Sequence, residues 1–255
     1  MTPPPPMPPA IPAATLVILR DSVGGPPELL MVERARGMAF AAGALVFPGG
    51  RIDPGDHDLA ARFGDDSEDG AARVAAIRET IEEAGLPIAL DPMPSPTDLD
   101  RLRAALHAGE AFGAALDAIG ARIVPDLLEP FARWRPAHAH ARIFDTRFYI
   151  ARLPADAPAA TVDRTENVRL LWATAQAVLD AADTGTVQII FPTRRNLERL
   201  ARHARYDDAV ADARARPVRT VTPWAETRDG VEHLCIPDDL GYPITSQPLS
   251  DAVRG

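Results

Sequence analysis

Apolar positions near the start of the chain predict three short strands in succession. Residues 13–20 (AATLVILR) are apolar and rich in β-branched side chains, which is typical of a buried strand. Glycines and prolines at 24–27 predict a turn, so we expect residues 29–33 (LLMVE) to form the returning strand. Residues 43–47 (GALVF) predict a third strand, which ends at the Pro-Gly-Gly of 48–50. Glycines after a strand let the backbone turn sharply and approach a ligand closely.

The pattern changes to a helical period at residues 71–84. Val74, Ile77 and Ile81 are spaced i, i+3 and i+7, which places them on one apolar helix face. Gly85 suits the end of this helix because glycine readily adopts the left-handed conformation that ends many helices.

The acidic segment that precedes this helix, residues 53–70, has no clear period, and we expect it to be a loop. Ser67 or Asp69 near its end is suited to cap the helix.

Regular patterns continue beyond Gly85. Residues 97–123 show helical spacing again and predict two helices. The later elements that we expect are strands at 143–153 and 168–172 and helices at 173–182 and 194–205. Strands interspersed with isolated helices predict a mixed α/β (α+β) fold built in layers.

The expected domain organisation is simple. The chain has 255 residues with an apolar fraction of 46%, which allows one domain with a core of useful size. We expect that domain at 12–255, with a helical insertion at about 91–136, after a disordered Pro-rich tail at 1–11.

Charge and cysteine content narrow the class of protein. A net charge of −9 does not attract nucleic-acid backbones, so we expect no nucleic acid among the partners. Cys235 is the single cysteine, which rules out an internal disulfide and fits a reducing compartment such as the cytoplasm. The sequence contains neither a long apolar run nor a signal-peptide pattern, so we expect no membrane partner.

Three carboxylates carry the clearest chemical signal. Glu79, Glu82 and Glu83 are spaced i, i+3 and i+4, which places them on one face of the predicted helix. Like charges side by side repel one another, so a purely structural helix gains nothing from this arrangement. A divalent cation reverses the sign of the interaction, and hard cations prefer oxygen ligands. The spacing therefore indicates a platform for metal-assisted hydrolysis.

These carboxylates lie within a longer motif. The order Arg-Glu-x-x-Glu-Glu-x-Gly at 78–85, after Phe-Pro-Gly-Gly at 47–50, resembles the box of the Nudix hydrolases. With background frequencies of ~6–7% per residue, five fixed positions match by chance roughly 10⁻⁶ times per start. The resemblance therefore outweighs the alternative of a solvated acidic helix face.

Resemblance to the Nudix hydrolases implies a mixed-sheet α/β/α sandwich that binds Mg²⁺ or Mn²⁺. It implies that Glu79, Glu82 and Glu83 are metal ligands and catalytic groups, and that the Gly50 carbonyl is a further ligand. In the same resemblance, Arg78 braces the loop through a salt bridge. The residues that would complete the structural part of the box are Gly49, Gly85 and Asp56.

The chain departs from the usual box in two ways. Asp56 stands where the family has a glutamate, and residues 57–77 separate it from Arg78, which is 14 more than the usual seven. An insertion of this length in a loop costs little free energy. The enlarged box and the later stretch 142–154 (RIFDTRFYIARLP) resemble peroxisomal-type coenzyme A diphosphatases. In that resemblance, Glu166 matches an acidic position that would complete the metal site.

The expected function is hydrolysis of a diphosphate bond in a small molecule. The substrate is a nucleoside diphosphate linked to another group, for which coenzyme A or its acyl derivative is the first choice. The alternatives are a nucleotide-sugar or dinucleotide pyrophosphatase, or a Nudix-fold binding module without turnover. Arg194 and Arg195 begin a basic stretch that suits substrate phosphates.

The segment 91–136 is expected to shape the substrate pocket and select the group beyond the diphosphate. Its leucines and phenylalanine recur at helical spacing and must bury their faces somewhere. The alternative is that these helices only extend the core or form the interface of a homodimer. Arg101, Arg103 and Arg133 are its candidate contacts to the substrate.

Overall fold

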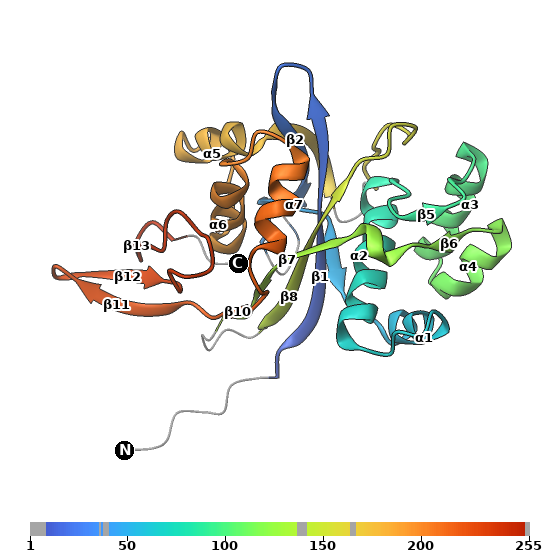
Figure 1. Cartoon of the computed structure of the whole chain (residues 1–255), viewed down its shortest axis with the longest axis horizontal. Coiled ribbons are helices and arrows are strands. Elements are labelled where there is room, and N and C mark those ends of the chain that lie inside the picture. Colours follow the sequence, from blue (N-terminus) through green and yellow to red (C-terminus); the bar gives the residue numbers. More distant parts are fainter. Residues whose placement is uncertain (1–8, 36, 38–40, 137–141, 164–166, 253–255) are drawn as a thin grey trace.

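The computed structural model describes residues 9–35, 37, 41–136, 142–163 and 167–252. An eight-stranded mixed sheet lies at the centre and is covered by helices on both faces, so the chain forms three α/β/α layers (Figure 1). This is the fold class that the sequence predicts.

The central sheet combines parallel and antiparallel pairs. Its strands are β1 (Ile11–Ser22), β2 (Gly25–Arg34), β3 (Leu45–Val46), β4 (Gly49–Arg51), β7 (Glu129–Trp134), β8 (Phe144–Arg152), β9 (Asn167–Thr174) and β10 (Thr220–Val221). The order is β10-β7-β8-β1-β2-β3, while β4 pairs with β1 and β9 pairs with β2. The β1–β8 and β10–β7 pairs are parallel and the others are antiparallel.

Helices and smaller strands surround this sheet. The helices are α1 (Pro54–Arg62), α2 (Glu68–Ala84), α3 (Pro96–His107), α4 (Phe112–Ile119), α5 (Ala175–Asp183), α6 (Phe191–Leu200) and α7 (Tyr206–Arg214), with a 3₁₀ turn at Pro125–Leu127. The strands outside the central sheet are β5 (Leu90–Asp91), β6 (Arg122–Ile123), β11 (Trp224–Arg228), β12 (Val231–Cys235) and β13 (Ser246–Pro248). The helices α1 to α4 lie on one side of the sheet and α5 to α7 on the other (Figure 1).

Side-chain alternation along the strands separates the core into two parts. Leu16 and Ile18 of β1 pack with the side chains of α2, α3 and α4. Val17 and Leu19 of the same strand face the other way and pack with α5, α6 and α7. Because successive side chains of a strand point to opposite faces, one apolar strand supplies both layers of the core.

Helix α2 begins and ends at residues that the sequence indicates. Ser67 is the N-cap, and its hydroxyl accepts a hydrogen bond from the Gly70 amide at 3.0 Å. Gly85 has φ 61°, the left-handed conformation, and its amide donates to the Ile81 carbonyl. The helix starts at Glu68, three residues before the predicted start.

The expected loop at 53–70 is partly wrong, because helix α1 occupies its first half. Pro54 stands in the first turn of α1, where its fixed φ suits a helix. The Asp56 carboxylate accepts a hydrogen bond from the Asp53 amide at 2.8 Å, which satisfies a donor at the helix start. Strong local capping therefore replaces the missing hydrophobic period.

The segment 91–136 is helical only in its first part. Helices α3 and α4 bury Leu102 and Leu116 in the same core as α2, while β5 and β6 pair into a short ribbon. The segment ends in β7, which belongs to the central sheet and which the pattern did not predict. A register shift between Pro130 and Ala132 interrupts the alternation of β7, and a proline within a run argues against a strand.

The predicted helix at 194–205 is shifted and shorter. Helix α6 spans Phe191–Leu200, and the chain then turns before α7. The polar side of α6 is buried, although its sequence is typical of a solvated face. Its buried polar side chains are Thr193, Arg195, Asn196, Glu198 and Arg199.

The C-terminal segment covers α6 and provides partners for these polar groups. Arg195 donates to the Ile244 carbonyl at 3.1 Å and to the Gln247 side chain at 2.6 Å. Arg195 also forms an ion pair with Glu198 at 3.0 Å. The Asn196 side chain accepts hydrogen bonds from Trp134 and Tyr242 at 3.3 and 3.1 Å. Residues 236–248 are therefore attached to the core by buried polar contacts.

Two expectations concern the ends of the chain and the membrane. The expected tail at 1–11 ends earlier than predicted, since Ile11 already pairs with Phe144 as part of β1. Residues 1–8 lie outside the described part. Within the described ranges, no helix combines the length and apolarity needed to cross a membrane.

Removing the buried Arg195 guanidinium is expected to destabilise the fold strongly. In Arg195→Met, Glu198 keeps a charge that is buried without its partner, so the free energy of unfolding should fall by about 3–5 kcal/mol. In Arg195→Met/Glu198→Leu neither charge remains, and much of the loss should be recovered. Urea denaturation measures both.

The matched control is Arg194→Met. Arg194 pairs with Asp183, whose side chain is 62% exposed, so a change of about 0–1 kcal/mol is expected. Equal losses in Arg194→Met and Arg195→Met would contradict the role of Arg195 as an anchor.

Candidate active site

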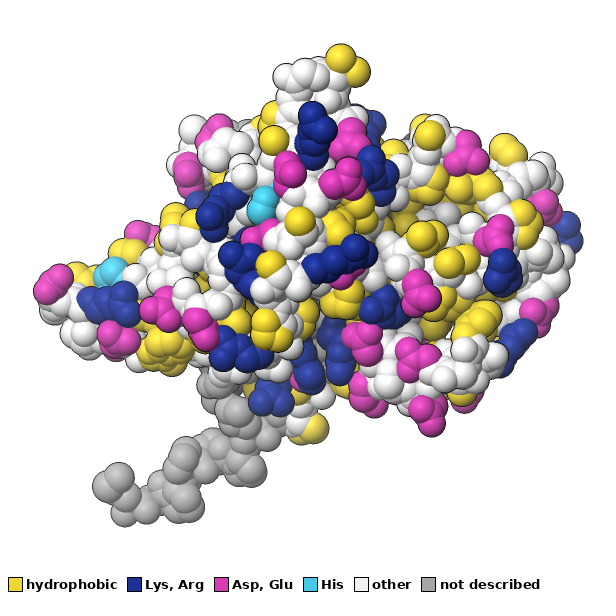
Figure 2. All heavy atoms as spheres, in the orientation of Figure 1, with side chains coloured by type: hydrophobic (Ala, Val, Ile, Leu, Met, Phe, Trp, Pro, Cys, Tyr) yellow, Lys and Arg dark blue, Asp and Glu magenta, His cyan; other side chains and the backbone are white. Residues whose placement is uncertain are grey.

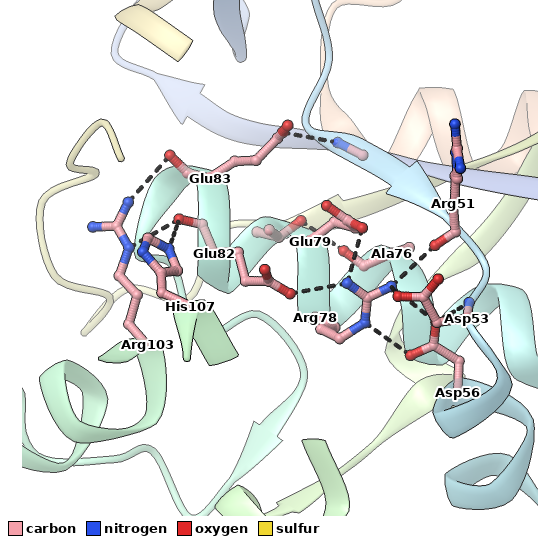
Figure 3. A network of polar contacts seen from close by, with 12 residues as sticks. Arg51, Asp53, Asp56, Ala76, Arg78, Glu79, Glu82, Glu83, Arg103 and His107 are labelled. Atoms are coloured by element: carbon pink, nitrogen blue, oxygen red, sulfur yellow. Dashed lines mark hydrogen bonds and ion pairs between the residues drawn. The ribbon is translucent and has the colours of Figure 1, made fainter. Parts of the chain in front are cut away.

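The acidic face of α2 borders a large cavity. The three carboxylates of this face point in two directions. The side chains of Glu79 and Glu82 are 17% and 24% exposed, and both turn toward Arg78. Glu83 is buried and turns toward the first residue of β4, Gly49 (Figure 3). In the part of the chain that is described, no group of three or more His, Cys, Asp or Glu side chains is arranged as a metal site.

Arg78 connects the acidic helix face to the enlarged loop. Its Nε and Nη2 donate to the two carboxylate oxygens of Asp56, each at 2.9 Å, and Nη2 also donates to the Arg51 carbonyl at 3.0 Å. Its Nη1 donates to Glu79 and Glu82, each at 2.9 Å (Figure 3). One guanidinium therefore holds helix α1, strand β4 and two of the three carboxylates.

Asp56 is the salt-bridge partner through which Arg78 braces the loop. Its side chain is 1% exposed, and the Arg78 side chain is 11% exposed. The bidentate pair is therefore largely removed from solvent, where a hydrogen-bonded ion pair is stronger than at the surface.

The two glycines of β4 bring the backbone against the helix. The Gly49 amide donates to the Glu83 carboxylate at 3.0 Å. A Cβ on Gly50 would lie 2.3 Å from the carboxyl carbon of Glu79, and one on Gly49 would lie 2.4 Å from the Ala14 carbonyl oxygen. The obstacle at Gly49 is backbone, so that position requires glycine, whereas a side chain at Gly50 would displace the Glu79 carboxylate.

Burial raises the pKa values of two carboxyls. Burial raises the pKa of Glu79 to about 7, with the charge of Arg78 opposing this effect and that of Glu82 adding to it. Burial and the charge of Glu79 raise the pKa of Glu83 to about 8, against the lowering effect of a nearby Asn167. The two groups are thus close enough to repel each other.

Arg78 shows the complementary effect. Burial opposes its charge, but the hydrogen bond to Asp56 and the charges of Glu79 and Asp56 outweigh burial and raise its pKa above the usual range. The guanidinium therefore stays protonated and remains the fixed positive charge of the acidic face.

The C-terminal end of α2 is held by α3. Arg103 donates to the Glu82 carbonyl at 2.9 Å and to the Glu83 carbonyl at 3.3 Å, and it also contacts Thr161 (Figure 3). The His107 ring nitrogen lies 3.2 Å from the same Glu82 carbonyl. Of the three candidate arginines in the inserted segment, Arg103 thus contacts helix α2 rather than the open cavity.

A cavity of about 1060 Å³ lies at one end of the central sheet and is lined by residues from α2, α6 and the β11–β12 hairpin. Its acidic side chains are Asp53, Glu79, Glu82, Glu83 and Asp163, and Arg78, Gly49 and Gly50 lie beside the three glutamates. Three further arginines line it: Arg34, Arg51 and Arg142. Aromatic side chains from several elements form much of the remaining wall: Phe47, Trp134, Phe144, Phe148, Phe191 and Trp224.

The inserted segment, 91–136, contributes to this cavity at two places. Leu106, His107 and Gly109 line it at the end of α3, and Trp134 and Pro136 line it at the end of β7. Arg133 instead pairs with Asp145 at 2.7 Å, and Arg101 lies 3.6 Å from Asp98 on the surface.

The two candidate substrate arginines lie elsewhere. Arg195 is 2% exposed and is bound to the C-terminal segment. Arg194 lines a second cavity of about 470 Å³ and pairs with Asp183 at 2.7 Å. Neither lines the cavity that contains the acidic face. Glu166 lies outside the described residues.

Several cavity residues had no distinct signal in the sequence. Arg51 follows directly after the Pro-Gly-Gly turn, so its position next to Gly50 could have been anticipated. Arg34 is the last residue of β2 and belongs to no motif. Arg142 begins the stretch 142–154, but nothing in that stretch indicated that this arginine would line the cavity. The residues from 222 to 234 reach the site only through tertiary structure.

Comparison with known proteins supports the fold. No family model matches the chain. A solved Nudix hydrolase from Alicyclobacillus acidocaldarius is 29% identical, with a TM-score of 0.68 over 81% of this chain and 97% of that one. The Nudix domain of Shewanella oneidensis NrtR, complexed with ADP ribose, is 14% identical, with a TM-score of 0.44 over 77% and 88% of the two chains.

A Caenorhabditis elegans Ap4A hydrolase is 20% identical, with a TM-score of 0.38 over 68% of this chain and 87% of that one. The assignment rests on the Alicyclobacillus protein, since the other two similarities are weak. The chain has the mixed α/β fold of the Nudix hydrolases, as the sequence predicts. The motif that resembles that family's box lies on α2 and at residues 47–50.

Loss of the Arg78 guanidinium is expected to lower stability. Arg78→Met leaves the buried Asp56 carboxylate without its partner, so the free energy of unfolding should decrease by about 3–5 kcal/mol. Thermal or urea denaturation of the variant measures this loss.

Arg62→Met provides the matched control. Arg62 pairs with Asp117, but the two side chains are 51% and 63% exposed, so about 0–1 kcal/mol is expected. An unchanged unfolding midpoint in Arg78→Met would show that the Arg78–Asp56 pair does not brace the fold.

Proposed function

We propose that the chain is a metal-dependent Nudix hydrolase that cleaves the diphosphate bond of a nucleoside diphosphate linked to another group. The observation that carries the proposal is the acidic face of α2, which borders a cavity of about 1060 Å³ that is also lined by Arg34, Arg51 and Arg142. Carboxylates suit a divalent cation and arginines suit phosphate oxygens, so one cavity offers partners for both.

The residues present fit a divalent cation. Glu79 and Glu83 are buried carboxylates whose charges repel each other, and a cation between such groups would remove that repulsion. We propose that Glu79, Glu82 and Glu83 hold Mg²⁺ or Mn²⁺, with the Gly50 carbonyl as a further ligand and Glu166 as a candidate to complete the set. When bound, the ion would polarise phosphoryl oxygens and activate water for attack on phosphorus.

The side chains around the carboxylates prepare this site. Arg78 keeps Glu79 and Glu82 on the cavity side of the helix, and the Gly49 amide orients Glu83. Such fixed orientation matters because rate acceleration depends on charges that are already in place when charge develops on the substrate. In this proposal, one of the three glutamates also orients or deprotonates the attacking water.

For the group beyond the diphosphate, we propose coenzyme A or an acyl derivative. The support is the enlarged box and the stretch 142–154, which resemble that branch of the family, together with a cavity at the upper end of the usual size for ligand pockets. The alternatives are a nucleotide sugar or a dinucleotide. A binding module without turnover is disfavoured, because such a module gains nothing from three clustered carboxylates.

Glu83→Gln is expected to lose activity while the fold is kept. The amide retains the shape and an oxygen for the Gly49 amide but removes one charge, so turnover should fall by at least ~10²-fold, as for loss of one preorganised electrostatic group. The assay uses coenzyme A, an acyl-coenzyme A, a nucleotide sugar and a dinucleotide with magnesium, and identifies the products by mass.

Glu110→Gln is the control, because Glu110 is an exposed glutamate that does not line the cavity. Near-normal rates in both Glu82→Gln and Glu83→Gln, or full activity in excess chelator, would end the proposal. If only the nucleotide sugar is hydrolysed, the proposed substrate is a nucleotide sugar and not coenzyme A.

Gly50→Ala tests the close approach of β4 to the helix. The added Cβ forces the Glu79 carboxylate to move, and a displacement of about 1 Å at a reacting centre costs roughly 10²-fold in rate. Gly55→Ala is the control, since a Cβ there meets no atom within 4 Å. Equal turnover in the two variants would show that the position of Glu79 is unimportant.

A further inference from the structure

The cavity continues well past the acidic face of α2, to an end that is chemically different. Six side chains form what we call the apolar end: Trp134, Phe191, Pro192, Pro223, Trp224 and Leu234. They come from the end of β7, the start of α6, and the β11–β12 hairpin with the residues just before it. In Figure 1 the hairpin and α6 lie on the opposite side of the sheet from α2, and residues of all three line the cavity.

At this end Trp224, which is 43% exposed, offers ring surface rather than hydrogen bonds. Trp134 and Phe191 are only 1% and 3% exposed, so they support the wall from behind. The Trp134 indole nitrogen already donates to Asn196 and Tyr242. The Trp224 indole nitrogen donates to Glu226 at 3.1 Å. Thr193 and Thr222 are the hydroxyl side chains that line the cavity from the same segments.

A ligand group that occupies the apolar end therefore finds few hydrogen-bond partners there. A sugar would bury several hydroxyls without partners, at about 1–3 kcal/mol each. A hydrocarbon group has no such penalty and gains from every methylene removed from water, at about 0.8 kcal/mol each.

The hairpin that forms this wall projects from the body of the protein. Strand β11 is exposed along its whole length, and Trp224 is 43% exposed. Figure 2 shows acidic and basic side chains around the tip of this projection, on the left of the view. The charged tip is suited to solvent, while the base of the hairpin presents Trp224 and Leu234 to the cavity.

We propose that Trp224 and the apolar end select substrates whose group beyond the diphosphate carries a hydrocarbon chain. This inference rests on the proposed function, because it places the diphosphate at the acidic face of α2. Trp224 is then a specificity residue that makes no contact with the reacting phosphorus. Trp224 affects the binding of the substrate's hydrocarbon chain and not the reaction at phosphorus.

Two synthetic substrates isolate the hydrocarbon group: the ethyl and the octyl ester of ADP on its terminal phosphate. For the unmodified protein with magnesium, kcat/KM is expected to be at least tenfold higher for the octyl ester. Trp224→Ala should lower kcat/KM for the octyl ester about tenfold, mainly through KM, and change that for the ethyl ester less than twofold. Trp224→Phe, which keeps a ring, should retain most of the preference.

Val231→Ala is the matched control, because Val231 is 48% exposed on the same hairpin and does not line the cavity. Thermal denaturation of each variant checks that the hairpin is intact. Equal kcat/KM for the two esters, an equal loss for both in Trp224→Ala, or a better rate with a nucleotide sugar than with the octyl ester overturns the inference while leaving the hydrolase proposal standing.

A binding measurement separates the two proposals if turnover is absent. The octyl ester of ADP with a methylene group between the two phosphorus atoms cannot be hydrolysed there, and its binding can be measured by calorimetry. Tighter binding of the octyl than the ethyl analogue, lost in Trp224→Ala, supports the apolar end even if the hydrolase proposal fails. Equal binding of the two analogues overturns it.

Discussion

The contact between Arg78 and Asp56 is the one on which the rest of the site depends. Through this pair a single side chain joins the enlarged loop, strand β4 and the acidic face of α2. Without the Arg78 guanidinium, three carboxylates on one helix face would repel one another and spread apart. With it, Glu79 and Glu82 share the Arg78 Nη1, and Glu83 accepts a hydrogen bond from the Gly49 amide. Positional order in the site therefore comes from the protein's own charges.

The C-terminal part of the chain shows a second kind of order. Helix α6 is polar in sequence, yet its polar groups are buried and bind the segment that follows the hairpin. Arg199 extends the same arrangement by contacting Asp212 and the Phe131 carbonyl. Buried polar groups of this kind must find partners or cost free energy, so they define one position for the segment. Because β13 of this segment pairs with β12, and β12 pairs with β11, these contacts also position the cavity wall near Trp224.

What the sequence could predict depended on whether the signal was local. Helix α2 was predictable because its apolar period, Ser67 and Gly85 all lie within one continuous stretch. The acidic face and the glycines before it were predictable because they form a spaced motif. Strand β7 was missed because Pro130 and a register shift break its alternation.

Arg195 shows why the rest was not predictable. An arginine next to another on a helix suggests a phosphate contact or a solvated face, and the local sequence does not distinguish these from burial. Its partners, Ile244 and Gln247, lie 49 and 52 residues further along the chain. The same reason hid the role of the hairpin, since no motif connects residues 222–234 to the acidic face. Long-range packing decides both.

The contact of Arg103 with the end of α2 has a consequence for the electrostatics of that helix. Peptide dipoles align along a helix and leave partial negative charge at its C-terminal end, where carboxylates are disfavoured. Glu82 and Glu83 stand in this last turn, next to the carbonyls that carry the charge. Arg103 places a guanidinium directly on those two carbonyls. The inserted helix α3 thereby offsets the helix dipole, which lets α2 carry two adjacent glutamates in its last turn.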